Sequence, residues 1–201
     1  MFVQVIQARV ADPDNLRAAF DRWAEELAPE ALGWLGTIAG VTGDAQFIGL
    51  VRFESEEAAR RNRDRPEQEL WWAETSKLFT GNVAVLDSRA AYLGRGGGSD
   101  QAGFVQVIQR QVRDVARARE ILDQLSPLVA EFRPEDIGTV VVEHGEDRFT
   151  VAVYFTSEQA ARGTERKPAP ALQVLRDEQN ALCVEPPKYY DLRQPWFYSP
   201  R

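Results

Sequence analysis

The sequence has one cysteine, Cys183, and one histidine, His144, among its 201 residues. A single cysteine excludes a disulfide within the chain, so we expect a protein of a reducing, cytoplasmic compartment. One histidine and one cysteine cannot supply the usual zinc, iron–sulfur or blue-copper ligand sets, so no metal site is expected. A haem held by His144 alone is still compatible with this composition.

Long hydrophobic runs and an excess of positive charge are also missing. No segment approaches the ~20 consecutive apolar residues of a membrane-spanning helix, and the first residues carry no basic targeting segment. Lys and Arg number 24 against 31 Asp and Glu, which gives a formal net charge of −7. Such a surface repels phosphate backbones and anionic lipid, so neither nucleic acid nor a membrane is an expected partner.

What the sequence does contain is an internal repeat. Phe2-Val3-Gln4-Val5-Ile6-Gln7 recurs letter for letter as residues 104–109, an offset of 102. Without a gap, residues 2–66 align with 104–168 at 23 identities in 65 positions, where chance gives about four, which indicates a duplication. Beyond Pro66 a shift of two residues restores the alignment, so that Asp87 faces Asp191.

The repeat divides the chain into two homologous parts. We expect half one over 1–93, a Gly/Ser-rich linker over 94–103, half two over 104–192 and an aromatic tail over 193–201. The tail sequence Trp196-Phe197-Tyr198 is too apolar to remain in water. We therefore expect it to fold back over a groove or to dock onto a second subunit.

Each half is predicted to have the order β-α-β-β-α-β. Residues 2–10 alternate as a strand does, and Asp12-Pro13 begins a helix as N-cap and first-turn proline. Strands are also predicted over 36–42, 46–54 and 82–88, and in half two over 138–143, 148–156 and 186–192. This is the order of a ferredoxin-like unit, whose two helices cover one face of a four-stranded sheet.

The first strand is apolar on both faces, so both faces of its sheet need cover. Helices cover one face, and the sheet of the other half is the natural cover for the second. The sequence therefore predicts an α+β fold in which tandem ferredoxin-like (βαββαβ) repeats form an intramolecular α/β barrel. The chain would then be a monomeric pseudo-dimer or would pair further as a homodimer.

These repeats, their hairpins and the Ser-Glu-x-Ala-Ala-Arg start of the second helix, at 55–60 and 157–162, resemble the dimeric α/β-barrel superfamily. The branch that they resemble most is the antibiotic-biosynthesis monooxygenase-like proteins. The resemblance implies a monooxygenase that needs no cofactor and acts on an aromatic or polyketide-like small molecule. An alternative is a non-catalytic small-molecule-binding or stress-associated barrel. A third alternative is haem binding, because haem-degrading members of the superfamily use an Asn, a Trp and a helix-borne His. His144 does not match that helix position.

The monooxygenase hypothesis places a pocket between the sheet and the helices of half one. Its catalytic residues would be Arg52, which stabilises a phenolate, Asn62, which hydrogen-bonds the reacting oxygen, and Trp72, which stacks on the substrate. The alternative for Arg52 is an ion pair, with Glu54 for example. The alternative for Trp72 is ordinary core packing.

Three more residues are candidates for substrate binding. Trp71 would extend an aromatic wall, Tyr154 stands where half one has Arg52, and Gln4 recurs as Gln106. The glutamines could equally bond each other across the pseudo-twofold axis, the interpretation that we favour.

Two reactive residue types have ordinary interpretations. His144 could be a general base, but its alignment with Thr42, next to a turn glycine, favours an exposed hairpin tip. Cys183 aligns with Phe79 and is expected to be a small core residue rather than a nucleophile.

Overall fold

The computed structural model describes residues 1–166 and 169–200. The chain divides into two compact units, residues 1–90 with 194–200 and residues 91–193, called half one and half two below. Residues 167 and 168 lie outside the described part, and with them the last pair of the repeat alignment, Pro66 with Pro168.

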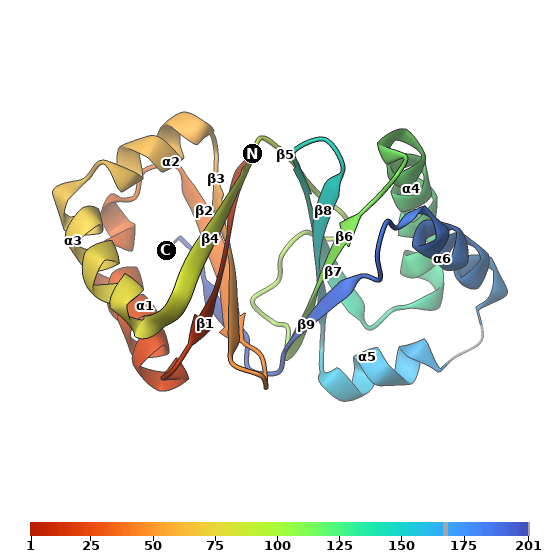
Figure 1. Cartoon of the computed structure of the whole chain (residues 1–201). Coiled ribbons are helices and arrows are strands. Elements are labelled where there is room, and N and C mark those ends of the chain that lie inside the picture. The colour runs from red at the N-terminus through yellow and green to blue at the C-terminus, as the bar shows by residue number, and fades with distance from the viewer. Residues whose placement is uncertain (167–168, 201) are drawn as a thin grey trace. The chain divides into compact units, whose positions relative to one another are not determined.

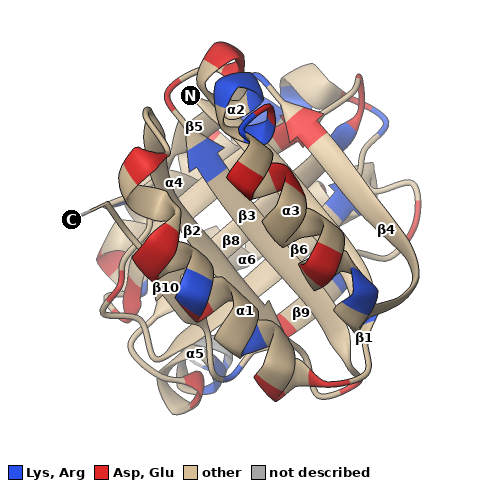
Figure 2. Cartoon of the chain, turned by 90° about the vertical axis from the view of Figure 1, so that its left-hand side faces the viewer, with Lys and Arg blue, Asp and Glu red and all other residues tan. Residues whose placement is uncertain are grey.

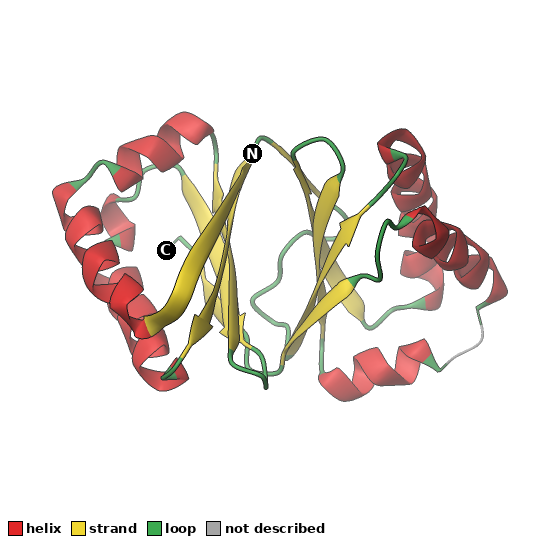
Figure 3. Ribbon diagram, viewed as in Figure 1, coloured by secondary structure: helices red, strands yellow, loops and turns green. Residues whose placement is uncertain are grey.

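Half one contains the first repeat. Its elements are β1 (Phe2–Val10), α1 (Pro13–Glu26), the short turn η1 (Ala28–Glu30), β2 (Trp34–Val41), β3 (Gln46–Phe53), α2 (Glu56–Arg63), α3 (Pro66–Thr75), η2 (Ser76–Leu78) and β4 (Phe79–Ser88). The chain then continues through β5 (Ala90–Leu93). Half two follows with β6 (Phe104–Gln111), α4 (Val115–Phe132), β7 (Asp136–His144), β8 (Arg148–Phe155), α5 (Glu158–Glu165), α6 (Pro170–Leu182) and β9 (Lys188–Leu192), and β10 (Trp196–Tyr198) comes last. Within each half the helices lie on one face of the sheet (Figures 1 and 3).

Each sheet has five strands, one more than the predicted unit. The orders are β10-β2-β3-β1-β4 and β5-β7-β8-β6-β9. Strand β5, which follows β4 in the chain, therefore completes the sheet of half two. Strand β10, which follows β9, completes the sheet of half one. The C-terminal tail folds back as an antiparallel strand, with Trp196 opposite Ala39 in β2.

The strand register repeats as the sequence predicted. Phe2 pairs with Phe53 in half one, and Phe104 pairs with Phe155 in half two. Both second strands carry an irregularity at the same place, before Gly36 and before Gly138. The α+β class and the two ferredoxin-like halves are confirmed. The second strands begin two residues earlier than predicted, at Trp34 and Asp136.

Local signals fix the helix starts. The Asp12 carboxylate accepts from the backbone N–H of Asn15 (3.0 Å), and Asp114 caps α4 in the same way through Arg117 (2.9 Å). The hydroxyl of Ser55 caps α2. No helix in the described ranges is long and apolar enough to cross a membrane.

The core of half one is filled by aromatic rings between the sheet and the helices. Phe20 on α1 contacts Phe47, Trp71 and Trp196 at centroid distances of 5.4–6.0 Å. Trp23 packs edge-on against Trp34 at 5.0 Å. Acidic and basic residues are interspersed along α1, α2 and α3 (Figure 2).

Candidate functional site

Half two contains a cavity of about 640 Å³ between its sheet and its helices. Its floor is the helix-facing side of the sheet, where alternate residues of β6, β7, β8 and β9 point inward. Its walls come from α4, α5, α6 and the segment that contains β5. The lining residues are Tyr92, Leu93, Gly94, Arg95, Gln106, Ile108, Arg110, Leu122, Asp123, Leu125, Ser126, Val129, Arg133, Asp136, Thr139, Val141, Val151, Val153, Phe155, Ala161, Arg162, Arg176, Gln179, Asn180, Tyr189 and Asp191.

The cavity exists because half two has smaller or more polar side chains where half one has rings. The two repeats align at offsets of 102 and 104. At eight of the aligned positions half one has an aromatic residue, and half two has an aromatic residue at one of these eight. The pairs are Phe20/Leu122, Trp23/Leu125, Trp34/Asp136, Trp71/Leu175, Trp72/Arg176, Phe79/Cys183, Trp196/Tyr92 and Tyr198/Gly94. Rings that would fill this space are absent, so the same backbone arrangement leaves a hollow.

The glycine-rich segment that the sequence suggested as a linker forms part of the cavity wall. The Gly94 N–H donates to the Thr139 carbonyl (2.9 Å), and the Arg95 carbonyl accepts from the Thr139 N–H (3.2 Å). A Cβ on Gly138 would lie 1.9 Å from the Gly97 carbonyl oxygen, so the two chains approach too closely for any side chain there. The segment is therefore packed along β7.

Five arginines line the cavity: Arg95, Arg110, Arg133, Arg162 and Arg176. Arg95 donates to the carbonyl of Arg133 at the end of α4 (3.0 Å), and Arg162 pairs with Asp191. Burial lowers the pKa of Arg110, and burial together with the charge of Arg176 lowers that of Arg133. Three carboxylates, Asp123, Asp136 and Asp191, line the same cavity, so its five arginines exceed its carboxylates by two.

One carboxyl group in the cavity has a strongly shifted pKa. Asp136 is 5% exposed, and burial raises its pKa to about 6, although it accepts from the Gly138 N–H (3.2 Å) and lies near Arg95 and Arg176. A carboxyl that titrates near neutral pH can accept a proton and return it. Burial, with Glu143 and Asp123 nearby, also raises the pKa of Tyr92 to about 12, so its phenol stays protonated.

The structure does not bring Arg52, Asn62 and Trp72 together. Asn62 is buried at the end of α2, where its Oδ1 accepts from Arg65 (3.2 Å). Trp72 packs on Phe79 (6.1 Å) among the aromatic rings.

Arg52 alternates with two residues that pack toward the helices, Val51 and Phe53, so it points to the opposite face of β3. Its Nη2 donates to the Leu35 carbonyl (3.3 Å) rather than to Glu54, and its Nε has no hydrogen-bond partner in the part of the chain that the structure describes.

The predicted substrate-binding residues are also dispersed. Trp71 donates its indole N–H to the Ala19 carbonyl (3.0 Å) inside the aromatic core. Tyr154 is buried on the face of β8 opposite to the cavity, since its neighbours Val153 and Phe155 line the cavity.

The repeated glutamines have their partners within their own sheets. Gln4 donates to Asp87 (2.9 Å), and Gln106 donates to Asp191 (2.9 Å). The strand beside each glutamine thus provides a carboxylate partner, and a bond between Gln4 and Gln106 across the pseudo-twofold axis stays a prediction.

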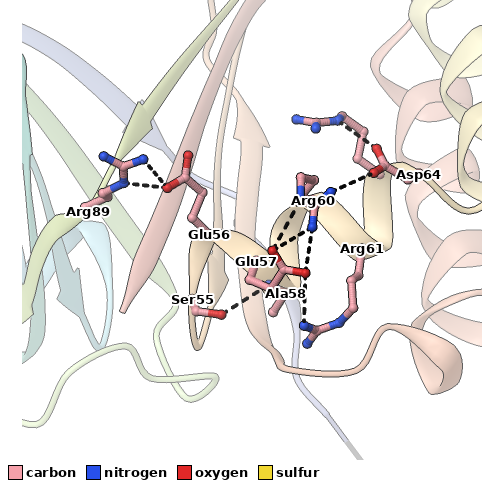
Figure 4. A network of polar contacts seen from close by, with 9 residues as sticks. Ser55, Glu56, Glu57, Ala58, Arg60, Arg61, Asp64 and Arg89 are labelled. Atoms are coloured by element: carbon pink, nitrogen blue, oxygen red, sulfur yellow. Dashed lines mark hydrogen bonds and ion pairs between the residues drawn. The ribbon is translucent and has the colours of Figure 1, made fainter.

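Gln4 also lines a smaller hollow of about 280 Å³ in half one, beside the start of α2. Figure 4 shows the charged network there, with Arg89 on Glu56 and with Arg60 and Arg61 on Glu57. The hydrogen bond and charge of Arg60 lower the pKa of Glu57. These are exposed pairs, so Arg60 and Arg61 lie on a solvated face of α2.

His144 is not at an exposed tip. Strand β7 continues through it, opposite Arg148, and the side chain is 6% exposed with Nε2 3.0 Å from Thr150 Oγ1. Burial lowers its pKa. Cys183 is a buried core residue, as predicted. Across residues 1–166 and 169–200, no group of three or more His, Cys, Asp or Glu side chains could hold a metal ion.

The cavity residues were missed by sequence reasoning, but a signal for them was present. Arg110, Arg133 and Arg176 stand where half one has Ala8, Ala31 and Trp72. These replacements of apolar residues by charged ones inside a repeated core are the pattern that marks the half with the cavity.

Solved structures resemble the whole chain. A candidate monooxygenase from Fusobacterium nucleatum has a TM-score of 0.79 at 9% identity and covers 98% of this chain and 94% of its own. A candidate monooxygenase from Lactobacillus acidophilus has a TM-score of 0.68 at 14% identity, with 98% of each chain covered. An anthrone oxidase-like protein has a TM-score of 0.65 at 15% identity, with 98% and 93% covered.

This chain shares their fold. The resemblance to the antibiotic-biosynthesis monooxygenase-like branch is thus confirmed for the fold, including the tandem form. No protein-family model and no curated protein matches the sequence.

Proposed function

We propose that the protein oxygenates an acidic aromatic molecule, without a cofactor, in the cavity of half two. One observation carries the proposal. A single cavity of about 640 Å³ combines an apolar part of its floor, several arginines and the buried carboxyl of Asp136. This volume suits a small organic ligand. The names of structures with the same fold, which include monooxygenases and an anthrone oxidase-like protein, support this reaction class.

The reaction follows from the chemistry of the lining groups. Asp136 accepts a proton from an activated CH₂ group of a phenolic ring system, and the arginine charges stabilise the resulting carbanion or phenolate. This anion reacts with O₂: one oxygen atom becomes the carbonyl of the product, and the other leaves as water. The CH₂ carbon supplies all four electrons that O₂ accepts, so the balance R₂CH₂ + O₂ → R₂C=O + H₂O needs no external reductant.

Anthrone is a suitable probe, because its CH₂ group lies between two aromatic rings and its oxidation gives a coloured quinone. We expect O₂ uptake and anthraquinone formation in a one-to-one ratio, above the rate in buffer alone. Asp136→Asn keeps the acceptor for the Gly138 N–H but is a poor base, so it should lower kcat by about 10²-fold or more. Asp177→Asn, on the exposed side of α6, serves as the matched control.

The same assay separates the two halves. Arg52→Ala and Trp72→Ala test the site predicted in half one. If these variants abolish turnover and Asp136→Asn does not, the reaction takes place in half one and the present proposal fails. Binding of anthrone without any O₂ uptake would identify the protein as a non-catalytic binder instead.

A further inference from the structure

We propose that Arg110, Arg133 and Arg176 form a recognition site for a carboxylate of the ligand, distinct from the group that reacts. The proposal rests on the proposed function in using the same cavity, and it narrows the substrate class to aromatic carboxylic acids.

The three arginines come from separate elements, and all three line the cavity. Arg110 lies in β6, Arg133 ends α4, and Arg176 lies in the middle of α6. Arg176 is close enough to lower the pKa of both Arg110 and Arg133 by charge repulsion. Glu135 lies near Arg133 and Asp136 lies near Arg176, yet the pKa of Arg133 stays lowered, so a further anion from a ligand would be stabilised here.

The fold does not need these charges. Half one forms the same sheet and helices with Ala8, Ala31 and Trp72 at the three positions, and Ala8 and Ala31 are buried there. The arginines are found only in the half that has the large cavity. A structural role common to both repeats therefore does not explain them.

Other arginines of half two are used differently. Arg117 pairs with Glu178 (2.6 Å), and Arg193 pairs with Glu158 (2.9 Å). In contrast, Arg176 makes no ion pair or hydrogen bond within 1–166 and 169–200, and the buried Nε of Arg110 has no hydrogen-bond partner there. The half-exposed Tyr189 hydrogen-bonds the Arg110 guanidinium and leaves its buried Nε unpartnered. N–H donors thus remain for a ligand.

A carboxylate fits these donors better than other anions would. Guanidinium groups present parallel N–H donors that match the two oxygens of a planar carboxylate. The neighbouring floor is apolar, with Ile108, Val151 and Val153 on adjacent strands. Arg110 follows Ile108 on the same face of β6, so a flat aromatic ring on that floor would place an attached carboxylate beside Arg110.

The test compares two probes of nearly equal shape, anthraquinone-2-carboxylate and anthraquinone-2-carboxamide. Both are quinones without a reactive CH₂, so binding is measured by calorimetry with no turnover. We expect the carboxylate to bind at least about tenfold more tightly than the carboxamide, because charge-assisted hydrogen bonds are the strong ones. In Arg176→Gln and Arg110→Gln the ratio should fall below about threefold, and Arg176→Lys should retain an intermediate ratio.

Arg61→Gln, an exposed change on α2, should leave the ratio unchanged. Equal affinity for the two probes in the wild-type protein, or a ratio that survives in both glutamine variants with unchanged circular dichroism, would overturn the proposal. Failure of the proposed function looks different: the carboxylate preference would remain while neither anthrone nor anthrone-2-carboxylate gives O₂ uptake.

Discussion

Replacing Trp196 with alanine should destabilise half one, although this residue follows the whole of half two in the sequence. Trp196 is 5% exposed and contacts both Phe20 and Phe47 at centroid distances of 6.0 Å. A buried tryptophan covers about 200 Å² of apolar surface, which at ~25 cal/mol/Å² corresponds to about 5 kcal/mol.

Two effects set the size of the loss. The cavity left by the ring adds to it, and measured Trp→Ala changes in cores cost about 3–5 kcal/mol. If β10 detaches instead, its three residues regain roughly 1–2 kcal/mol each of conformational freedom, which limits the loss. We therefore expect a decrease of about 3–5 kcal/mol in the free energy of unfolding of half one.

The assay is denaturant unfolding followed by tryptophan emission. All five tryptophans belong to half one, so emission reports on that half, and four of them remain in the variant. Tyr92→Ala is the matched control, because Tyr92 holds the equivalent position beside the cavity and is only half-buried. A loss below about 1 kcal/mol in Trp196→Ala, or an equal loss of half-one stability in Tyr92→Ala, would refute the packing argument.

Two further predictions concern stability. The folded pKa of Asp136 is about 6, against 3.8 for the free side chain, so the folded state binds the extra proton and wild-type stability falls as pH rises from about 4 to 6. Asp136→Asn should thus be more stable than wild type at pH 7 by up to about 3 kcal/mol. Near pH 4 it should be no more stable than wild type. A difference between the melting curves that does not change with pH would contradict this. The methyl group of Gly138→Ala must displace the chain at Gly97, so this variant should lower the free energy of unfolding by about 2 kcal/mol or more. Gly163 has open space around it, so Gly163→Ala should be neutral or stabilising by up to ~1 kcal/mol. Equal denaturation midpoints for the two alanine variants would show that the close approach at Gly138 is relaxed easily.

The fold could be predicted because the repeat carries its own register. The strands that contain Phe2 and Phe104 pair at corresponding residues, and the two-residue shift after Pro66 is present in the pairing of Gln4 with Asp87 and of Gln106 with Asp191. The fifth strands could not be predicted, since each pairs with a sheet that is distant in sequence, and three residues such as Trp196–Tyr198 carry too little periodicity.

The cavity was harder to predict, because it is an absence of atoms. Trp71 and Trp72 suggested an aromatic pocket, but large rings at a repeated core position fill space, and their smaller counterparts Leu175 and Arg176 leave it open. His144 shows another limit: extending a strand by one residue changes a turn position into a buried one.

The exchange of terminal strands has a consequence for synthesis on the ribosome. Half one cannot complete its sheet until β10 has been made, after all of half two. At ~5–20 residues per second the intervening hundred or so residues take roughly 5–20 s. During this time the outer edge of β2 lacks its partner strand, and Phe20 and Phe47 lack the indole that covers them. The nascent chain should therefore depend on chaperones more than two independent domains of the same size would.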